Sequence, residues 1–371
     1  MWPTAFMNSI LFLKTSSMNI LITGGCGFVG SHLALALKSK YPSYNLYALD
    51  NLRRRGSELN ISRLKEAGIT FVHGDIRNKS DFDALPKIDT VIDAAAEPSV
   101  QSGLDGSTDY LIDTNLNGTI NTLNFALRNK ADFIFLSTSR VYPIERIGEI
   151  KFTESNTRYD LSKEQLLPGI TQAGISEQFP LNGYRSLYGT TKLAGELIME
   201  EYQSLLGLKG VINRCGVITG PYQMGKVDQG VVVLWMARHF WKKSLSYTGY
   251  GGLGKQVRDM LPVSDLFRLI DLQIHDMKRF QGEVFNVGGG VESSVSLKEL
   301  TSLCESITGN RIPISAVTET NKADIRIYLT DNAKITKWCG WKPEVTVKDT
   351  LNSIYCWIRD NESQLNKILN A

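Results

Sequence analysis

The chain has 371 residues, of which 42% are hydrophobic and 21% are charged, and its formal net charge is +3. This balance is typical of a globular protein, and so small a positive charge does not suggest a nucleic-acid-binding protein. Five scattered cysteines without a CxxC pair and four histidines without ligand spacing argue against disulfides and a metal site. We therefore expect a cytoplasmic protein with reduced thiols and without a metal, nucleic acid or membrane as partner.

The first 17 residues precede the first strand signal. Their apolar run is short and has neither a basic flank nor a small-residue cleavage site, so a secretory signal is not expected. The run is also too short to cross a membrane. We expect residues 1–17 to form a poorly ordered N-terminal extension.

Short apolar segments that favour strands alternate with helical patterns in the first half of the chain. The strand signals are NILIT, NLYALD, ITFVHGD, TVIDAA and DFIFLST, which begin at residues 19, 45, 69, 90 and 132. This alternation predicts an α/β fold with a Rossmann-type, doubly wound parallel sheet. We expect this sheet over residues 18–213 and a smaller substrate-binding lobe over 214–371, with some segments of the lobe returning to the first domain. In this second part, Ser296 and Glu299 form the pattern of a capping box, and Gly309 marks the end of that helix.

A glycine-rich loop joins the first strand signal to a helical pattern. Gly24, Gly27 and Gly30 are spaced three residues apart in this loop, and Asp50 ends the second strand signal twenty residues after Gly30. In this context the pattern predicts a dinucleotide site, where backbone approaches the pyrophosphate and the acid binds the ribose diol. An acid here favours NAD over NADP, although Arg53–Arg55 could pair with a 2′-phosphate. A glycine turn required only for packing is the alternative.

A tyrosine and a lysine lie four residues apart in the segment YGTTK. Tyr188 and Lys192 therefore share one face of the expected helix. Alone, they would be read as surface residues. The preceding strand, however, delivers Ser137, Thr138 and Ser139 to the carboxyl edge of the sheet, where ligands bind in such folds. The combination marks candidate catalytic residues.

These segments together resemble the extended short-chain dehydrogenase/reductase family, and in particular its NAD-dependent nucleotide-sugar epimerases. The resemblance covers residues 18 to about 360. The matching segments are TGGCGFVG at 23–30, Asp50, GDI at 74–76, Asn115, STSRVY at 137–142, YGTTK at 188–192, GP at 220–221, RD at 258–259 and FNVGGG at 285–290.

The resemblance implies a role for each residue of the catalytic set. Tyr188 would be the general base, and because a free tyrosine has a pKa near 10, Lys192 would favour the phenolate and hold the nicotinamide ribose. Thr138 would bind the reacting hydroxyl. The implied NAD contacts are Gly24, Gly27, Phe28, Val29, Gly30, Asp50, Asn51, Asp75, Ile76, Ala94, Ala95, Ala96, Asn115, Ser137, Tyr188 and Lys192.

The residues after Thr138 bear on the reaction. A dehydratase of the family would carry an acid there, whereas this chain has Ser139 and Arg140, which argues against dehydration. Closer similarity to the CDP-paratose (tyvelose) 2-epimerase type rests on GGCGF at 24–28, DQG at 228–230, GKQVRD at 254–259 and DIRIYLTD at 324–331. This similarity implies C2 epimerisation of a CDP-linked hexose or deoxyhexose. The implied substrate contacts are Thr138, Gln229, Gln256, Arg258 and Arg326.

Three alternatives stay open at this point: a nucleotide-sugar 4-epimerase, a reductase of the same family, and a non-catalytic NAD-binding protein. The family also implies a homodimer. Its interface would be a four-helix bundle built from the expected helices at 110–129 and 188–206.

Overall fold

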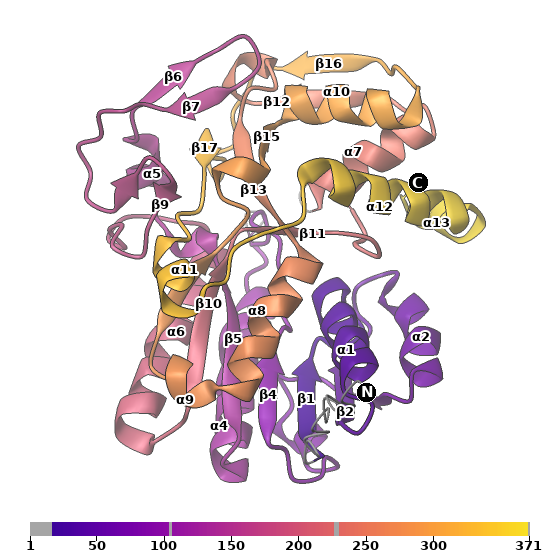
Figure 1. The fold of residues 1–371 in the computed structure, drawn as a ribbon, viewed down its shortest axis with the longest axis vertical. Coiled ribbons are helices and arrows are strands. Elements are labelled where there is room, and N and C mark those ends of the chain that lie inside the picture. Colours follow the sequence, from indigo (N-terminus) through magenta and orange to yellow (C-terminus); the bar gives the residue numbers. More distant parts are fainter. Residues whose placement is uncertain (1–16, 104–105, 226–229, 370–371) are drawn as a thin grey trace, which may run out of the picture.

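Seven parallel strands form the central sheet of the protein (Figure 1). The computed structural model describes residues 17–103, 106–225 and 230–369, so the predicted extension lies outside the described residues except for Ser17. The strand order is β3-β2-β1-β4-β5-β10-β14, which reverses between β1 and β4 and is the doubly wound order. The predicted fold class is confirmed. The strands are β1 (Asn19–Thr23), β2 (Asn45–Asp50), β3 (Thr70–His73), β4 (Thr90–Asp93), β5 (Asp132–Thr138), β10 (Gly210–Cys215) and β14 (Val284–Val287).

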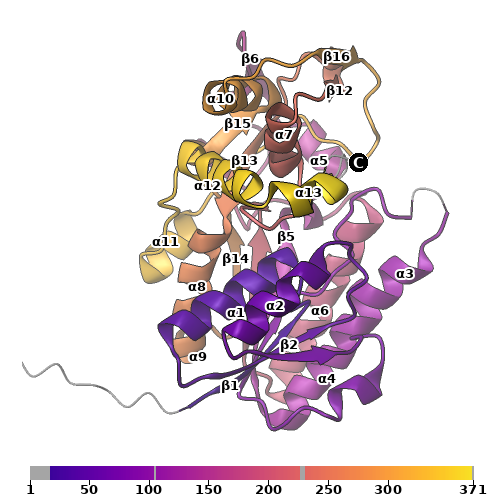
Figure 2. The same ribbon diagram turned by 90° about the vertical axis from the view of Figure 1, so that its right-hand side faces the viewer.

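Helices cover both faces of this sheet (Figure 2). Because successive strand residues point to opposite faces, Ile20 and Ile22 pack with Leu33 in one core, while Leu21 packs with Leu123 in the other. Apolar strands of this kind are buried on both sides, as in other parallel sheets. The helices of the first face are α1 (Phe28–Lys40), α2 (Asn60–Glu66) and α8 (Val263–His275). Those of the second face are α4 (Thr119–Asn129) and α6 (Leu187–Leu206).

The expected helix over residues 110–129 is interrupted. It consists of α3 (Asp109–Ile112), a π-helical segment (Asp113–Gly118) and α4. Within the π-helical segment, the Asn115 side chain is fully buried and bonds to the backbone of Glu97 in a neighbouring loop. Widened turns of this type occur often near functional sites. The expected helix over 188–206 is present as α6.

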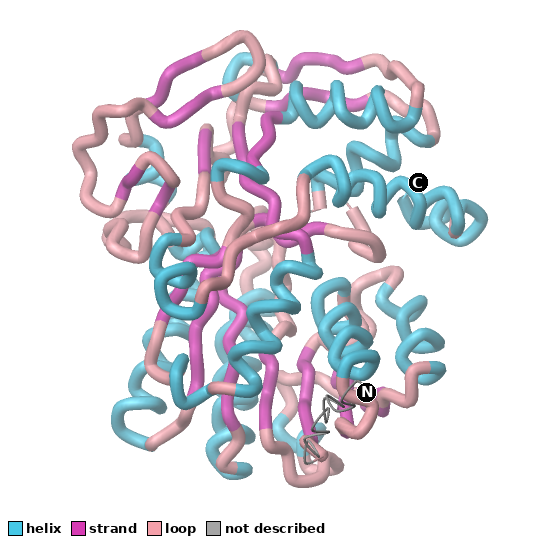
Figure 3. Tube along the Cα trace, viewed as in Figure 1, coloured by secondary structure: helices cyan, strands magenta, loops and turns pink. Residues whose placement is uncertain are grey.

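The part of the chain after β10 builds a lobe above the carboxyl edge of the sheet, although α8 and β14 return to the sheet itself (Figures 1 and 3). A smaller sheet pairs β13 (Val257–Pro262) with β11 (Val217–Thr219), β15 (Ser294–Ser296) and β17 (Ile327–Tyr328). The helices of the lobe that share one apolar core are α7 (Val231–Phe240), α10 (Leu297–Thr308), α12 (Val347–Asp360) and α13 (Glu362–Leu369).

Short elements complete the fold. The strands β12 (Leu245–Thr248) and β16 (Ile314–Val317) pair with each other. Between β5 and α6 lie α5 (Ile144–Gly148) and two hairpins, β6 (Phe152–Glu154) with β7 (Tyr159–Leu161) and β8 (Ile170–Thr171) with β9 (Gly174–Ile175). The remaining helices are α9 (Met277–Phe280) and α11 (Ala333–Cys339). In the part of the chain that the structure describes, no helix has the length and apolar character needed to span a membrane.

The capping prediction for α10 is confirmed. The Ser296 side chain accepts a hydrogen bond from the Glu299 backbone, and the Glu299 carboxylate accepts one from the Ser296 backbone. Gly309 ends the helix with φ +71°. Because β15 runs directly into this cap, the start of α10 is fixed at the wall of the lobe cavity described below.

Candidate active site

A cavity of about 650 Å³ opens at the carboxyl edge of the central sheet. Its position above the point where the strand order reverses is the usual place for a ligand in this fold. Most of the predicted cofactor residues line it: Gly24, Gly27, Phe28, Val29, Gly30, Asp50, Asn51, Ile76, Ala94, Ala95, Ala96, Ser137, Tyr188 and Lys192.

The glycine loop fits a dinucleotide pyrophosphate. Gly24 has φ +62°, and a Cβ there would lie 2.9 Å from the Ala95 Cα. A Cβ on Gly30 would lie 2.3 Å from the Gly24 carbonyl oxygen, so only glycine lets α1 begin this close to the loop. Gly27 caps α1 without a side-chain hydrogen bond, and the first turn carries no acid. The free N–H groups and the positive end of the helix dipole therefore suit an anion.

Asp50 is held at the end of β2 by backbone donors. Its carboxylate accepts hydrogen bonds from the amides of Cys26 at 3.0 Å and Leu52 at 2.8 Å. Burial raises the pKa of Asp50, and these hydrogen bonds act in the opposite direction. The fixed carboxylate lies on the cavity wall, where it can accept from a ribose diol.

The arginines that could have favoured a 2′-phosphate have other partners. Arg53 stacks over the Tyr110 ring at 3.7 Å. Arg54 donates to the Met224 carbonyl at 2.7 Å, and Arg55 donates to the carbonyl of a residue in α13 at 2.8 Å. With Asp50 at the ribose position, the residues fit NAD.

Two predicted cofactor residues, Asn115 and Asp75, do not line the cavity. Asn115 accepts from the Glu97 amide at 2.8 Å and donates to the Glu97 carbonyl at 3.0 Å, which holds the loop that follows β4. Burial raises the pKa of Asp75, but hydrogen bonds from Arg77 and Asn51 outweigh it and lower this pKa to about 2. Both residues therefore support cavity walls rather than form them.

Helix α6 presents Tyr188 and Lys192 to the cavity, one turn apart. Ser186 caps the helix by accepting from the Gly189 amide at 3.2 Å. A Cβ on Gly189 would lie 2.0 Å from the Arg140 carbonyl oxygen, so this glycine lets α6 pack directly against the end of β5. The close approach brings Tyr188 beside Thr138.

Two neighbours partly offset the effect of burial on the pKa of Tyr188. Burial raises the pKa of Tyr188 to about 12, while a hydrogen bond with Thr138 and the positive charge of Arg140 lower it. The phenol is therefore neutral at physiological pH in this state, and it needs further positive charge to act as a base.

Lys192 is almost fully buried, with 2% exposure. Its Nζ donates to the Leu136 carbonyl at 2.9 Å and lies 4.6 Å from the centre of the Phe135 ring. Burial lowers the pKa of Lys192, and the charge of the buried Asp93 raises it. Asp93 is held by the Thr23 hydroxyl at 2.6 Å. This acid below the site helps Lys192 to stay protonated.

A buried polar network that the sequence reasoning missed supports α6, the helix that carries Tyr188 and Lys192. Glu196, one turn after Lys192, accepts a hydrogen bond from the Ser137 hydroxyl and pairs with Arg214 at 2.7 Å. Arg214 also donates to the Tyr142 hydroxyl at 3.2 Å. The signal that could have found it is the repeat of polar residues every four positions along α6.

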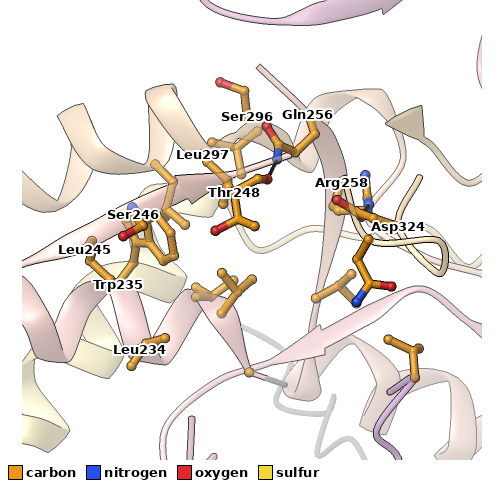
Figure 4. Close-up of a pocket in the computed structure, with 18 of the residues that line it drawn as sticks. Leu234, Trp235, Leu245, Ser246, Thr248, Gln256, Arg258, Ser296, Leu297 and Asp324 are labelled. Atoms are coloured by element: carbon orange, nitrogen blue, oxygen red, sulfur yellow. Dashed lines mark hydrogen bonds and ion pairs between the residues drawn. The ribbon is translucent and has the colours of Figure 1, made fainter. Parts of the chain in front are cut away.

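A second cavity, of about 570 Å³, lies in the lobe (Figure 4). Two predicted substrate residues, Gln256 and Arg258, line it. Arg258 donates to the Asp324 carboxylate at 2.8 Å and to the carbonyl of Ile325 at 2.5 Å. Gln256 donates to the Thr248 carbonyl at 2.8 Å. The wall is otherwise largely apolar, with residues of α7 and α10.

Two other predicted substrate residues differ from this pattern. Arg326 lines neither cavity, because its guanidinium stacks over Phe152 at 4.2 Å and lies 5.0 Å from the Tyr250 ring. It is therefore placed to join the β6–β7 hairpin to the lobe. Gln229 lies outside the described residues.

The two cavities meet at shared wall residues. Val100, Arg140, Val217 and Gly230 line both. Thr138 and Tyr188 lie on the sheet side of this junction, and Arg258 lies on the lobe side. A ligand with one end in the lobe could therefore place its other end beside the phenol and the dinucleotide. Within the described parts of the chain, no cluster of His, Cys, Asp and Glu could hold a metal ion.

A dinucleotide cradle beside a Tyr–Lys pair and a threonine defines the dehydrogenase-type class of enzymes, in which a positioned phenol moves a proton while the cofactor carries hydride. The profile of the NAD dependent epimerase/dehydratase family matches residues 20–288, and the chain belongs to this family. This confirms the resemblance seen in the sequence, and NAD is the cofactor.

Named relatives of this family differ in the reaction they catalyse. The chain is 31% identical to CDP-paratose 2-epimerase of Salmonella typhi over 92% of its own length and 99% of that enzyme's. It is 29% identical to a dTDP-glucose 4,6-dehydratase of Actinoplanes, over 93% and 99% of the two chains. A solved structure of UDP-glucuronic acid 4-epimerase from Bacillus cereus, with UDP-glucuronic acid and NAD, matches with TM-score 0.73 and 25% identity, over 92% and 99%.

Proposed function

We propose that the protein is an NAD-dependent epimerase that inverts carbon 2 of a CDP-linked hexose or deoxyhexose. The observation that carries the proposal is that Tyr188 lies beside Thr138 on the wall of the dinucleotide cavity, which shares wall residues with the lobe cavity. Similarity to the Salmonella typhi enzyme supports the choice of carbon and nucleotide.

The chain's own residues perform the proton chemistry. Tyr188, as phenolate, takes the proton of the sugar hydroxyl, and Thr138 holds that hydroxyl by a hydrogen bond. Lys192 contributes positive charge to the site. NAD, held by the glycine loop and Asp50, would supply the hydride chemistry at the sugar carbon, and return of the hydride to the opposite face would invert that carbon. Tyr188 then gives the proton back to the reduced oxygen, so that proton and hydride both balance over the cycle.

The residues after Thr138 favour epimerisation over dehydration. Loss of water needs an acid beside the leaving hydroxyl, and Ser139 and Arg140 occupy these positions. Arg140 is not a carboxylic acid, and it stays a cation at physiological pH, since burial and the charge of Arg258 lower its pKa only to about 10.

The lobe cavity supports a cytosine base. Gln256 is 8% exposed, and its Nε2 is fixed by the Thr248 carbonyl, which leaves its buried Oε1 without a partner. Gln256 and Thr248 both line the cavity (Figure 4), and each carries an acceptor oxygen, of which the Gln256 Oε1 is buried and has no partner. The amino group of cytosine carries two donors, whereas the N3–H of uracil stands between two carbonyl oxygens that these acceptors would repel.

Incubation with CDP-, UDP-, GDP- and dTDP-linked sugars, followed by proton NMR, tests the proposal. We expect inversion at carbon 2 of a CDP-sugar without net consumption of NAD. Inversion at carbon 4 would select the 4-epimerase, for which the Bacillus cereus structure is the precedent. Stoichiometric loss of reduced cofactor would select a reductase, and no reaction with any of these sugars would overturn the proposal.

The homodimer and the cytoplasmic location belong to the same proposal. Leu197 and Leu205 on α6 are 54% and 76% exposed, which suits a helix face that a second copy covers. Light scattering should give twice the mass of one chain. All five cysteines are free, as a reducing compartment requires.

A further inference from the structure

We infer that Arg140 is a positioning residue that bridges the sugar-proximal phosphate and the carbon-2 oxygen of the substrate, and so directs carbon 2 to Tyr188. The inference rests on the proposed function. It concerns a residue to which the family resemblance assigns no role, and it starts from the position of Arg140 at the junction of the two cavities.

The backbone of Arg140 is tied to the catalytic residues. It lies two residues after the end of β5, and its amide donates to the Thr138 hydroxyl at 3.2 Å. Its carbonyl oxygen lies against Gly189, the neighbour of Tyr188 on α6. A substrate group that the Arg140 side chain binds would therefore be held at a fixed position relative to the Tyr188 phenol.

The side chain of Arg140 reaches from the sheet to the lobe. Its Nη1 lies 3.3 Å from the Ala323 carbonyl, in the segment that also supplies Asp324 to Arg258. A single contact of this length leaves most of the five guanidinium donors for a ligand. Arg140 thus stands between the phenol on one side and the Arg258–Asp324 pair on the other.

The charged residues of the lobe cavity favour an anion. Among the described residues, Arg140, Arg238, Arg258 and Asp324 are the charged residues of its wall, so three cations face one carboxylate. Burial lowers the pKa of Arg140, and the like charge of Arg258 acts in the same direction. A diphosphate would relieve this repulsion, and the guanidinium fork suits phosphate oxygens.

The covalent structure of a nucleotide sugar then determines which sugar carbon lies beside Tyr188. The sugar-proximal phosphate is attached to carbon 1, and the neighbouring hydroxyl is that of carbon 2, so one guanidinium can donate to both oxygens. Carbon 4 lies across the ring from the phosphate. A cation that holds the phosphate beside Tyr188 therefore presents carbon 2 rather than carbon 4.

The test compares R140M, R140K and the matched control R146M, since Arg146 lies outside both cavity walls and pairs with Glu149 on the surface. Calorimetric titration with CDP and with cytidine measures the phosphate contact. We expect R140M to bind CDP about 10- to 100-fold more weakly and cytidine as the wild type does. R140K keeps the positive charge but lacks the guanidinium fork, so its affinity for CDP should lie between those of R140M and the wild type. R146M should bind CDP as the wild type does.

Turnover of CDP-sugars deuterated at carbon 2 or carbon 4 measures the second contact. R140M and R140K should both lose kcat, because lysine cannot hold the two oxygens together, and label transfer from carbon 4 should rise. Unchanged CDP affinity in R140M would overturn the inference, as would lower affinity with kcat and label position unchanged. Failure of the wild type to bind CDP or any other nucleoside diphosphate would instead remove the proposed function.

Discussion

Glu196 and Arg214 form an ion pair of 2.7 Å whose side chains are only 1% and 6% exposed. The Glu196 carboxylate also accepts a hydrogen bond from the hydroxyl of Ser137, and Ser137 lines the dinucleotide cavity. Burial of two charges costs free energy unless each remains paired and hydrogen-bonded. The pair therefore joins α6, which carries Tyr188, to β10 at a fixed separation.

Removing one partner of this pair should destabilise the protein strongly. We expect Glu196→Ala to lower the free energy of unfolding by about 3–5 kcal/mol, because Arg214 is left as an unpaired buried charge. Chemical denaturation measures the effect. The control Glu201→Ala, an exposed acid on the same helix, should change stability by less than about 0.5 kcal/mol. The double variant E196L/R214M should recover much of the loss, and equal losses for E196A and E201A would contradict the account.

Gly30 is expected to be essential for the shape of the dinucleotide loop. A Cβ there would lie 2.3 Å from the Gly24 carbonyl oxygen, so Gly30→Ala must displace either the loop or the start of α1. NAD affinity should fall at least about 10-fold, with a stability loss of roughly 1–3 kcal/mol. Gly148→Ala is the matched control, since no atom lies within 4 Å of a Cβ at that position. Isothermal titration measures the affinity of each variant for NAD. If both variants bound NAD as tightly as the wild type does, the prediction would be wrong.

His32 should make stability depend on pH. Burial lowers the pKa of His32 from 6.5 to about 4, and the charge of Arg63 acts in the same direction. Between these values the unfolded chain binds more protons, so the free energy of unfolding falls as the pH is lowered from about 6.5 to 4. Replacing His32 by glutamine should make this acid-induced loss of unfolding free energy smaller by about 1–3 kcal/mol.

The measurement is denaturation at pH 7 and pH 4.5 of the wild type, H32Q and H73Q. His73 is exposed, so H73Q should retain the wild-type pH dependence. If H32Q lost as much stability as the wild type on acidification, burial of His32 would not be the cause.

Gln256 should discriminate between pyrimidine bases. The wild type is expected to bind CDP more tightly than UDP, since the unpartnered Oε1 accepts from an amino group. Gln256→Leu should weaken CDP binding about 5- to 30-fold, because one hydrogen bond to the base is lost. The difference between the affinities for CDP and UDP should therefore become smaller. Gln364→Leu, at an exposed position of α13, should change neither affinity. Tighter binding of UDP than CDP by the wild type would contradict the assignment of the base.

Much of the framework was predictable from the sequence because it depends on local pattern. The five strand signals, the glycine loop and the Ser296–Glu299 cap each follow from residues close together in the chain. The family motifs likewise anticipated a match that covers residues 20–288. The placements of Asn115 and Arg326 could not be predicted, since each depends on partners that only the folded chain brings together.

The role proposed for Arg140 could likewise be inferred only from the structure. From the sequence alone, Arg140 was informative only because it is not the acid that a dehydratase of the family would carry after Thr138. Its importance comes from the approach of α6 through Gly189 and from the Arg258–Asp324 pair, which lies more than a hundred residues away. Long-range packing of this kind leaves no periodic signal.

The central claim is that Tyr188 moves the proton while carbon 2 of the sugar loses and regains its hydrogen. The most direct measurement is NMR of a CDP-sugar deuterated at carbon 2, incubated with the wild type, Tyr188→Phe and the exposed-site control Tyr184→Phe. The wild type and Y184F should invert carbon 2 and retain the deuterium there, while Y188F should be slower by about 100- to 10,000-fold. Inversion by Y188F at the wild-type rate, or inversion at another carbon with carbon 2 untouched, would contradict the account.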